Sequence, residues 1–374
     1  MEVCERGGSH GSIVRSEGNS MKPMALGILL GVLIAGLVPP LGLTPAAAQA
    51  PQDAKQQKPE PKPQEGGATI SVEVPVVTLD VVAATQHGDI ITGLKKENFR
   101  VLEDGAPQTI SSFAPTDAPI TMVLLMEFSS RGIYEYFAYT AKYWAGALFP
   151  SLQQKDWVAL VTFDMKSRVE VDFTQNKEEV IDAINHLYFP GFSESNVFDA
   201  LLDTNERLKD IKGKKSIVLM ATGVDTFSKH TLDQTMKELR QTDVTIFCVG
   251  LARGYVNYLD SHGMIGSIGR MNYLQGENQL RTFAQMTGGY GWFPQFDGEL
   301  PGIFQQVAAF LRNQYSMAYI PTNRNRDGKF RKIKVELVQA DGSPFVLQDQ
   351  KGKKQKYVVY AREGYIAPKG AVGD

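Results

Sequence analysis

The sequence has little cysteine and no marked surplus of charge of either sign. Its 374 residues include only two cysteines, Cys4 and Cys248, and the formal net charge is -2. A near-neutral chain with a pI near 6.3 gives no electrostatic reason to expect a nucleic acid as partner. Cys248 lies within the apolar run 244–250, where we expect its thiol to pack as a small hydrophobic group.

Motifs that carry catalysis are also missing. The five histidines show no spacing such as His-x-x-x-His, so no zinc site is expected. The stretch Gly213-Lys-Lys-Ser216 precedes an apolar strand and lacks the earlier glycine of a phosphate-binding loop. A hydrolase would need Ser193 or Ser195 to act with His186 or His230, and neither serine lies in a nucleophile-elbow motif. The sequence therefore predicts a protein that is not an enzyme.

No apolar run reaches the ~20 residues that cross a bilayer. The longest, residues 24–38, follows the basic Met21-Lys22 and precedes the small-residue tract 46–50. That order is typical of a secretory signal peptide. We predict that residues 1–48 are the signal peptide, that the true start is Met21, and that cleavage follows Ala48. A membrane-anchored N-terminus is the alternative.

An exported chain would be periplasmic or extracellular, with no transmembrane segment in its mature form. It would retain Cys248 alone and could form no internal disulfide. Residues 49–68 are rich in proline, glutamine, lysine and glutamate, which predicts a disordered linker. Short β runs separated by turn residues then predict a β unit over residues 69–118, with strands at 70–82, 99–102 and 109–113.

Residues 119–314 alternate between apolar strands and segments with helical spacing. The first strand, Pro119–Glu127, is apolar on both faces, as in the centre of a covered parallel sheet. Further strands are predicted at 157–163, 168–172, 216–221, 245–249 and 290–293, and helices at 134–148, 177–186, 197–209, 231–241, 278–287 and 299–313. This alternation predicts an α/β fold with a doubly wound, mostly parallel sheet.

The chain returns to β patterns over residues 315–366 and ends in a tail, 367–374. Strands are predicted at 315–320, 332–338 and 357–360, with a turn at Asp327-Gly328. Strands need partners and sheet edges need cover. We therefore expect the two flanking β units to form one split β-sandwich-like domain.

Two flanking phrases identify a family resemblance. The segment Ile91–Gln108, with its Glu103-Asp104-Gly105 turn, and the C-terminal phrases 319–323, 327–335 and 362–365 resemble the VWFA-related domain family of secreted bacterial proteins. The resemblance covers roughly residues 69–366 and implies a von Willebrand factor A (VWA) domain at 119–314. Such a fold usually implies adhesion or assembly and no single chemistry.

The resemblance also implies where a metal-ion-dependent adhesion site would lie. The family pattern Asp-x-Ser-x-Ser corresponds to Glu127, Ser129 and Arg131, the loop threonine to Ser195, and the later aspartate to Thr222. A guanidinium at a ligand position repels a cation and can pair with Glu127. Asp225 could partly compensate for the lost aspartate. We expect a degenerate site without metal or other cofactor; if Mg²⁺ or Ca²⁺ binds weakly, Glu127, Ser129 and Ser195 would hold it.

Residues 251–277 are expected to form a long loop after the strand at 245–249. It carries aromatic and methionine residues that suit a protein-binding surface, among them Tyr255, Tyr258, Met264 and Tyr273. A self-packing loop or a disordered insert is the alternative. The sequence thus predicts an exported, non-enzymatic VWA-type module that binds a protein partner, with a metal-dependent adhesion module and a cryptic hydrolase as alternatives.

Overall fold

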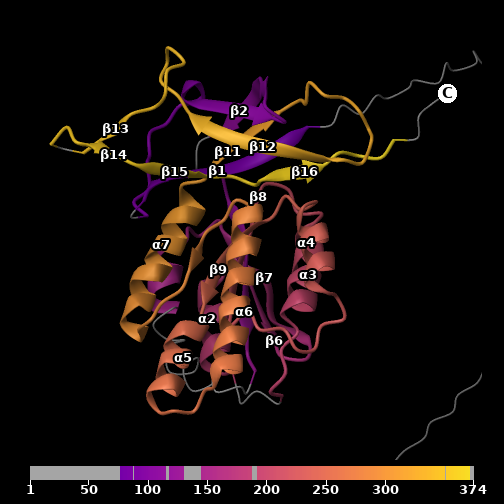
Figure 1. Cartoon of the computed structure of the whole chain (residues 1–374), viewed down its shortest axis with the longest axis vertical. Coiled ribbons are helices and arrows are strands. Elements are labelled where there is room, and N and C mark those ends of the chain that lie inside the picture. The colour runs from indigo at the N-terminus through magenta and orange to yellow at the C-terminus, as the bar shows by residue number, and fades with distance from the viewer. Residues whose placement is uncertain are drawn as a thin grey trace, which may run out of the picture. The chain divides into compact units, whose positions relative to one another are not determined.

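The computed structural model describes residues 76–86, 88–114, 118–129, 145–187, 192–349 and 351–370. A six-stranded sheet with helices on both faces lies below two smaller antiparallel sheets in Figure 1. Among the described residues no helix combines the length and apolar character needed to span a membrane. The expected α/β class with additional β sheets from both ends of the chain is confirmed.

The six-stranded sheet has the order β10-β9-β8-β5-β6-β7, and only β7 runs antiparallel to its neighbour. Its strands are β5 (Ile120–Glu127), β6 (Trp157–Phe163), β7 (Ser167–Thr174), β8 (Lys214–Ala221), β9 (Thr245–Gly250) and β10 (Gly291–Trp292). All eight residues of β5 and all eight of β8 are buried. These two central strands are apolar on both faces because helices cover both sides of the sheet.

Helices divide between the two faces of this sheet. One face packs against α2 (Lys177–Asn185), α7 (Leu300–Arg312) and the short helical stretch at 145–148. The other packs against α3 (Val197–Leu208), α4 (Leu232–Leu239) and α6 (Ser267–Met286). Cys248 is fully buried in the second core, as expected for a small hydrophobic side chain. The predicted helix at 134–148 lies mostly outside the described residues.

The predicted loop at 251–277 is wrong. Residues there form α5 (Ala252–Ser261) and the first half of α6, which extends far upstream of the predicted start at 278. Glycines at 263, 266, 269 and 276 weaken the helical pattern in the sequence. Tertiary packing stabilises the helix in spite of these glycines, because the second half of α6 packs against the rest of the domain.

Strands from both ends of the chain interleave in the upper layer. One sheet has the order β15-β1-β11-β4, with β15 (Tyr357–Tyr360), β1 (Val77–Thr85), β11 (Tyr315–Tyr319) and β4 (Ile110–Ala114). The other has the order β16-β12-β2-β3, with β16 (Gly364–Ile366), β12 (Phe330–Leu337), β2 (Phe99–Glu103) and β3 (Ala106–Gln108). Their inner faces share one apolar core. A separate hairpin joins β13 (Leu347–Gln348) to β14 (Lys354–Gln355).

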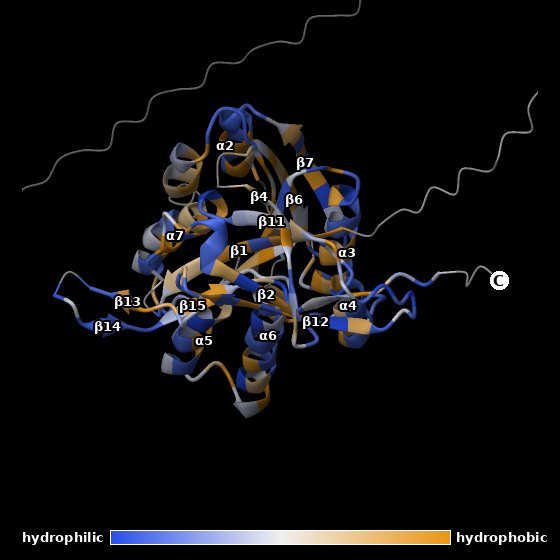
Figure 2. Cartoon of the chain, turned by 90° about the horizontal axis from the view of Figure 1, so that it is seen from above, coloured by the Kyte–Doolittle hydropathy of each residue, from blue (hydrophilic) through white to orange (hydrophobic). Residues whose placement is uncertain are grey.

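Three single 3₁₀ turns complete the described elements: η1 (Lys96–Asn98), η2 (Phe149–Ser151) and η3 (Asp297–Glu299). Figure 2, coloured by hydropathy, looks down on the strands of the upper layer. β1 starts at Val77, whereas the sequence predicted a strand from 70, and residues 70–75 lie outside the described part. The domain boundaries proposed from the sequence stay predictions.

Helix α6 approaches the loop after β8 unusually closely. A Cβ atom built on Gly276 would lie 2.8 Å from the Thr222 carbonyl oxygen and 2.8 Å from the Gly223 carbonyl carbon. Gly223 itself has a φ of +79°, a conformation that side chains rarely adopt. This backbone-to-backbone contact fixes the position of the loop that follows β8.

We predict that Gly276→Ala lowers the free energy of unfolding by about 1–3 kcal/mol, because the added methyl group would displace backbone on both sides. The matched control is Gly302→Ala in α7, where an added Cβ meets no atom within 4 Å. That change should be neutral or stabilise by up to about 1 kcal/mol. Urea unfolding of both variants measures the difference, and equal effects would contradict the close approach.

Candidate functional site

The site lies where the order of the strands reverses. The chain runs from β5 outward through β6 and β7, then returns to pair β8 with the other edge of β5. Ligands of open α/β sheets bind beyond the carboxyl ends of strands at such a switch point. Glu127 is the last residue of β5, and Thr222 directly follows β8. Parallel pairing brings these two residues to the same edge of the sheet.

The Glu127 carboxylate accepts three hydrogen bonds. Its Oε2 accepts one from the Thr222 backbone N–H at 2.7 Å and one from the Thr222 hydroxyl at 2.8 Å. Its Oε1 accepts one from the Ser129 hydroxyl at 3.1 Å. The three residues are 1–2% exposed. The structure therefore brings Glu127, Ser129 and Thr222 together in one buried network.

Burial raises the pKa of Glu127 above its ordinary value of 4.5, because an ionised carboxylate loses its hydration. Hydrogen bonds from Thr222 and Ser129 act in the opposite direction. The Ser195 hydroxyl faces the same carboxylate and also lowers its pKa, although its Oγ is too poorly placed to count as a hydrogen-bond donor. The neutral form of Glu127 is thus favoured more strongly than in water.

Ser195 lies just before α3 and is 1% exposed. Its backbone is fixed by the next loop: Thr226 N–H donates to the Ser195 carbonyl oxygen at 2.8 Å, and Ser195 N–H donates to the Thr226 hydroxyl at 3.0 Å. The neighbouring Asn196 is 5% exposed, and its Nδ2 donates to the Met165 carbonyl oxygen. Ser195 Oγ and Asn196 Oδ1 are buried and have no hydrogen-bond partner among the described residues.

Asp225 points to a helix and not to Glu127. Its Oδ2 accepts a hydrogen bond from Phe198 N–H at 3.0 Å and another from the Ser228 hydroxyl, and its Oδ1 accepts one from Ser228 N–H at 3.1 Å. A carboxylate at the first turn of α3 satisfies a free N–H group and complements the helix dipole. Arg131 lies outside the described residues, so its expected pairing with Glu127 stays a prediction.

The described oxygens suit a hard divalent cation poorly. Such an ion takes six or more oxygen ligands, among them at least one or two carboxylates that face it. Here Glu127 is the single carboxylate of the network, and both of its oxygens already accept hydrogen bonds. Within the described ranges no group of three histidine, cysteine or acidic side chains could hold a metal.

Sequence reasoning overlooked Asp164, which directly follows β6 and is 0% exposed. Its Oδ2 accepts a hydrogen bond from Arg168 at 2.6 Å, and its carbonyl oxygen accepts one from Asn196 N–H at 2.8 Å. Asp164 therefore positions the loop that carries Ser195. The sequence could have indicated Asp164, because it is an acidic residue at the carboxyl end of a predicted strand, as Glu127 is.

The serine–histidine pairs named from the sequence do not meet through Ser195. His230 Nδ1 lies 2.7 Å from Asp199 Oδ1, and His186 Nδ1 lies 2.6 Å from the Asp182 carbonyl oxygen. Both histidines are at least partly exposed, whereas Ser195 is buried. Neither histidine contacts Ser195 Oγ.

The helices α5 and α6 form a hairpin, residues 252–286, beside the site. Arg253 makes two 2.6 Å hydrogen bonds to Glu277, which also accepts one from Arg281 at 2.9 Å. Tyr255 and Tyr273 pack edge to face with ring centres 6.1 Å apart. Two of the four residues expected to bind a partner, Tyr255 and Tyr273, thus help to hold the hairpin together.

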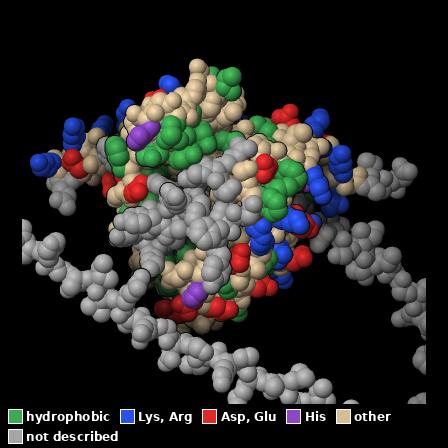
Figure 3. All heavy atoms as spheres, turned by 90° about the horizontal axis from the view of Figure 1, so that it is seen from below, with side chains coloured by type: hydrophobic (Ala, Val, Ile, Leu, Met, Phe, Trp, Pro, Cys, Tyr) green, Lys and Arg blue, Asp and Glu red, His purple; other side chains and the backbone are tan. Residues whose placement is uncertain are grey.

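The other two, Tyr258 and Met264, are 55% and 56% exposed. Three further apolar side chains on α6 are at least half exposed: Ile268, Met271 and Leu274. Figure 3 shows the hydrophobic side chains gathered on this face of the molecule. These five residues are called the hairpin patch below. Three of them, Ile268, Met271 and Leu274, follow a helical spacing that becomes visible only once α6 is known to begin at Ser267.

We predict that Glu127→Gln changes the pH dependence of stability. A raised pKa means that the folded state binds the proton more tightly, so the contribution of Glu127 to stability falls as pH rises above about 4.5. The glutamine variant should therefore gain stability relative to wild type between pH 5 and pH 8. Urea unfolding across that range measures it; a relative loss at the higher pH would instead reveal a positive partner for Glu127.

A model of the von Willebrand factor type A domain family matches residues 122–284. No curated protein matches the chain. Several solved structures are similar. Proximal thread matrix protein 1 from the mussel byssus is 16% identical over 53% of this chain and 49% of its own, with a TM-score of 0.40. This chain therefore matches only about half the length of the mussel protein.

A von Willebrand factor type A protein from Catenulispora acidiphila is 12% identical over 76% of this chain and 73% of its own, with a TM-score of 0.40. The vWF domain of the type V pili tip protein Mfa5 from Porphyromonas gingivalis is 11% identical over 51% and 94%, with a TM-score of 0.38. The family match covers the six-stranded sheet from β5 to the second half of α6. The chain therefore contains a von Willebrand factor type A domain.

Proposed function

We propose that the protein is an exported, non-enzymatic VWA-type module that binds another protein through the carboxyl end of its six-stranded sheet. Domains of this family commonly mediate protein interactions. The observation that carries the proposal is the hairpin patch, which exposes five large apolar side chains beside the Glu127 network. A clustered apolar surface of this kind is typical of interaction sites.

The arrangement of the patch suits a specific partner surface. The two hydrogen bonds from Arg253 on α5 to Glu277 on α6 hold the two helices in a fixed relation, so the patch is presented on a rigid support. Methionine and tyrosine side chains offer contact area that adapts to a partner. Gly276 joins α6 to the loop of Thr222, so a partner on the patch would also contact the rim of the switch point.

The Glu127 network supports a role that does not depend on metal. Its hydrogen bonds use the protein's own hydroxyl and amide groups, and burial favours the neutral carboxyl over the charged ligand that a cation needs. In this proposal the network keeps the strand-end loops in place. The export of the chain rests on the signal-peptide pattern of residues 1–48.

A metal-dependent adhesion module is the second candidate. The unpartnered Ser195 Oγ and Asn196 Oδ1 favour it, because buried acceptors usually face a ligand, an ion or ordered water. The cryptic hydrolase has no comparable support, since neither His186 nor His230 contacts Ser195.

Calorimetry and thermal unfolding decide between the first two candidates. We expect millimolar Mg²⁺ or Ca²⁺ to give no binding heat and no rise in Tm relative to a chelator-treated sample. Sodium at matched ionic strength serves as the control. A saturable heat that disappears in Ser195→Ala would establish the metal-dependent module instead.

Crosslinking of the mature protein in its native envelope, followed by purification, tests partner binding. We expect Ile268→Glu combined with Met271→Lys to reduce the recovery of a crosslinked partner at least tenfold, because two charges would have to be desolvated in the interface. Val346→Glu, at a side chain 41% exposed in the upper layer, is the matched control and should leave recovery unchanged. Chelator should have no effect. Equal recovery from all three proteins would contradict the proposal.

A further inference from the structure

The near-neutral net charge of the chain conceals an uneven distribution of charge. The described residues between 118 and 313, which form the VWA domain, include 16 lysines and arginines and 21 aspartates and glutamates. The described residues of the upper layer, 76–114 and 314–370, include 15 basic and 10 acidic side chains. The VWA domain therefore has an excess of five negative charges, and the upper layer an excess of five positive charges.

Much of the positive charge of the upper layer lies on one hairpin. The strands β13 and β14 pair with each other, and we call residues 347–356 the lysine hairpin. Its lysines, at positions 351, 353, 354 and 356, are all exposed, and Asp349 is the one acidic residue of the segment. Figures 1 and 2 both show this hairpin projecting beyond the rest of the upper layer. Its charges are therefore presented away from the body of the protein.

The carboxylate of the lysine hairpin is used by the turn itself. Asp349 Oδ1 accepts hydrogen bonds from Lys351 N–H at 2.9 Å and from Lys353 N–H at 2.8 Å. Asp349 N–H donates to the Lys353 carbonyl oxygen at 2.9 Å, and Gly352 supplies the positive φ of +75° within the turn. Asp349 is thus directed to the backbone, and it fixes the turn that carries the lysines.

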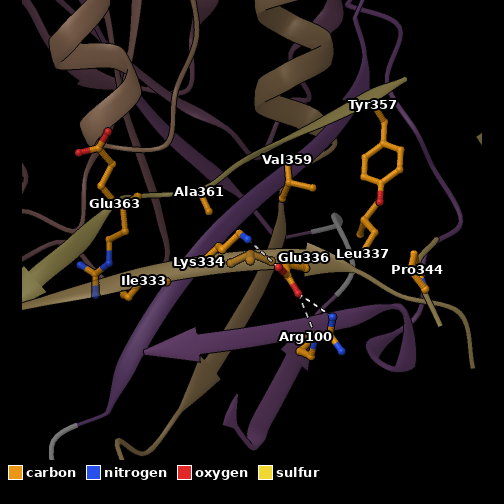
Figure 4. A pocket seen from close by; sticks show the side chains of 12 residues that line it. Arg100, Ile333, Lys334, Glu336, Leu337, Pro344, Tyr357, Val359, Ala361 and Glu363 are labelled. Atoms are coloured by element: carbon orange, nitrogen blue, oxygen red, sulfur yellow. Dashed lines mark hydrogen bonds and ion pairs between the residues drawn. The ribbon is translucent and has the colours of Figure 1, made fainter. Parts of the chain in front are cut away.

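Elsewhere in the upper layer, acidic side chains pair with basic ones. Glu336 pairs with both Arg100 and Lys334 at 2.7 Å, as Figure 4 shows. Asp327 pairs with Arg331 at 2.8 Å. Among the described residues of this layer, no ion pair includes a lysine of the lysine hairpin. Its four positive charges are therefore left to solvent ions or to a partner.

The form of the lysine hairpin indicates which kind of anion it suits. Lysine ammonium groups are hydrated point charges on flexible stems and lack the planar fork with which arginine grips a single carboxylate or phosphate. On a projecting hairpin such groups face outward and do not enclose one small ligand. An extended surface of negative charge can contact all of them at once. Clusters of about four or more basic residues are typical of binding to anionic lipid headgroups.

The charge of the rest of the molecule favours one orientation on such a surface. An anionic bilayer attracts the upper layer and repels the acidic VWA domain. Figure 1 places α5, which carries part of the hairpin patch, at the end of the molecule opposite to β13 and β14. Docking through the lysine hairpin therefore leaves the hairpin patch facing away from the bilayer.

We infer that the lysine hairpin docks the protein on the surface of an anionic phospholipid bilayer. Each basic residue close to such a surface strengthens binding about fivefold, so four lysines give a reversible, salt-sensitive attachment. This site goes beyond the proposed function and does not depend on the hairpin patch.

Vesicle binding of the mature, exported protein tests the inference. We expect vesicles of phosphatidylcholine with about one third phosphatidylglycerol to bind it at least tenfold more tightly than vesicles of phosphatidylcholine alone. Because salt screens exposed charges, about 0.5 M sodium chloride should remove most of this binding. Equal binding to both kinds of vesicle, or binding that persists in salt, would overturn the inference.

Two variants separate the lysine hairpin from charge elsewhere. The first replaces its four lysines: Lys351→Gln, Lys353→Gln, Lys354→Gln and Lys356→Gln. The matched control removes the same charge from four exposed lysines of the VWA domain: Lys166→Gln, Lys212→Gln, Lys229→Gln and Lys237→Gln. The first should bind phosphatidylglycerol vesicles at least tenfold more weakly, and the control should change binding less than twofold. Both share the same N-terminal segment, so its contribution cancels, and equal losses would refute docking through the hairpin.

Hydrogen exchange on the wild-type protein decides the question if the first variant fails to fold. Phosphatidylglycerol vesicles should slow exchange at residues 351–356 and leave residues 267–274 of the hairpin patch unchanged. The reverse pattern would contradict the inference. Polyglutamate and oligothymidylate are added as competitors at equal charge concentration. If either binds the lysine hairpin more tightly than the vesicles do, its partner is an acidic protein or a nucleic acid, and the bilayer is refuted.

Discussion

The hydrogen bonds between Glu127 and Thr222 join the ends of the two central strands, and the strand-end face depends on them. Parallel strands β5 and β8 meet edge to edge, but beyond residues 126 and 220 no ladder pair continues between them. Beyond that point the Glu127 carboxylate connects the two strands, because it accepts hydrogen bonds from both the backbone N–H and the hydroxyl of Thr222. The loop that follows is then clamped from the other side by Gly276 of α6. The network and the hairpin patch are therefore parts of one rigid edge.

Much of the fold could be predicted from residue patterns. The strand Trp157–Phe163 and the strand Tyr357–Tyr360 have the predicted limits, because both are runs of apolar and aromatic residues bounded by polar residues or turns. That strands from the two flanking β units pair with one another, as β1 does with β11 and β15, was expected from the need of strands for partners, but the individual pairings were not predicted. The α5–α6 hairpin could not be predicted in this way. Its five glycines are typical of a loop, and its helical state depends on contacts with residues distant in sequence.

The candidate site was predictable in part. Glu127 and Thr222 both follow apolar runs, so the ends of neighbouring parallel strands could be expected to meet. Asp225 could not be assigned from spacing alone, because its contact with the first turn of α3 depends on how two loops cross. Ile268 and Leu274 were missed for the same reason as the hairpin itself. When a helix is predicted as a loop, side chains that share one face of the helix are not recognised as a common surface.

The interleaved strands of the upper layer also constrain how the chain is made. Leu94 N–H donates to the Tyr315 hydroxyl across 221 positions, and the whole VWA domain lies between these two residues. Contacts so distant in sequence form late, since the intervening chain must first be ordered or closed into a loop. The VWA domain has all six of its strands between residues 120 and 292, and α7 completes its core by residue 312, so the domain can fold before the C-terminal strands are synthesised. Strands β1 to β4 must wait for the C-terminal strands, so a chain that ends before β11 would carry an unpaired, aggregation-prone edge at its N-terminal side.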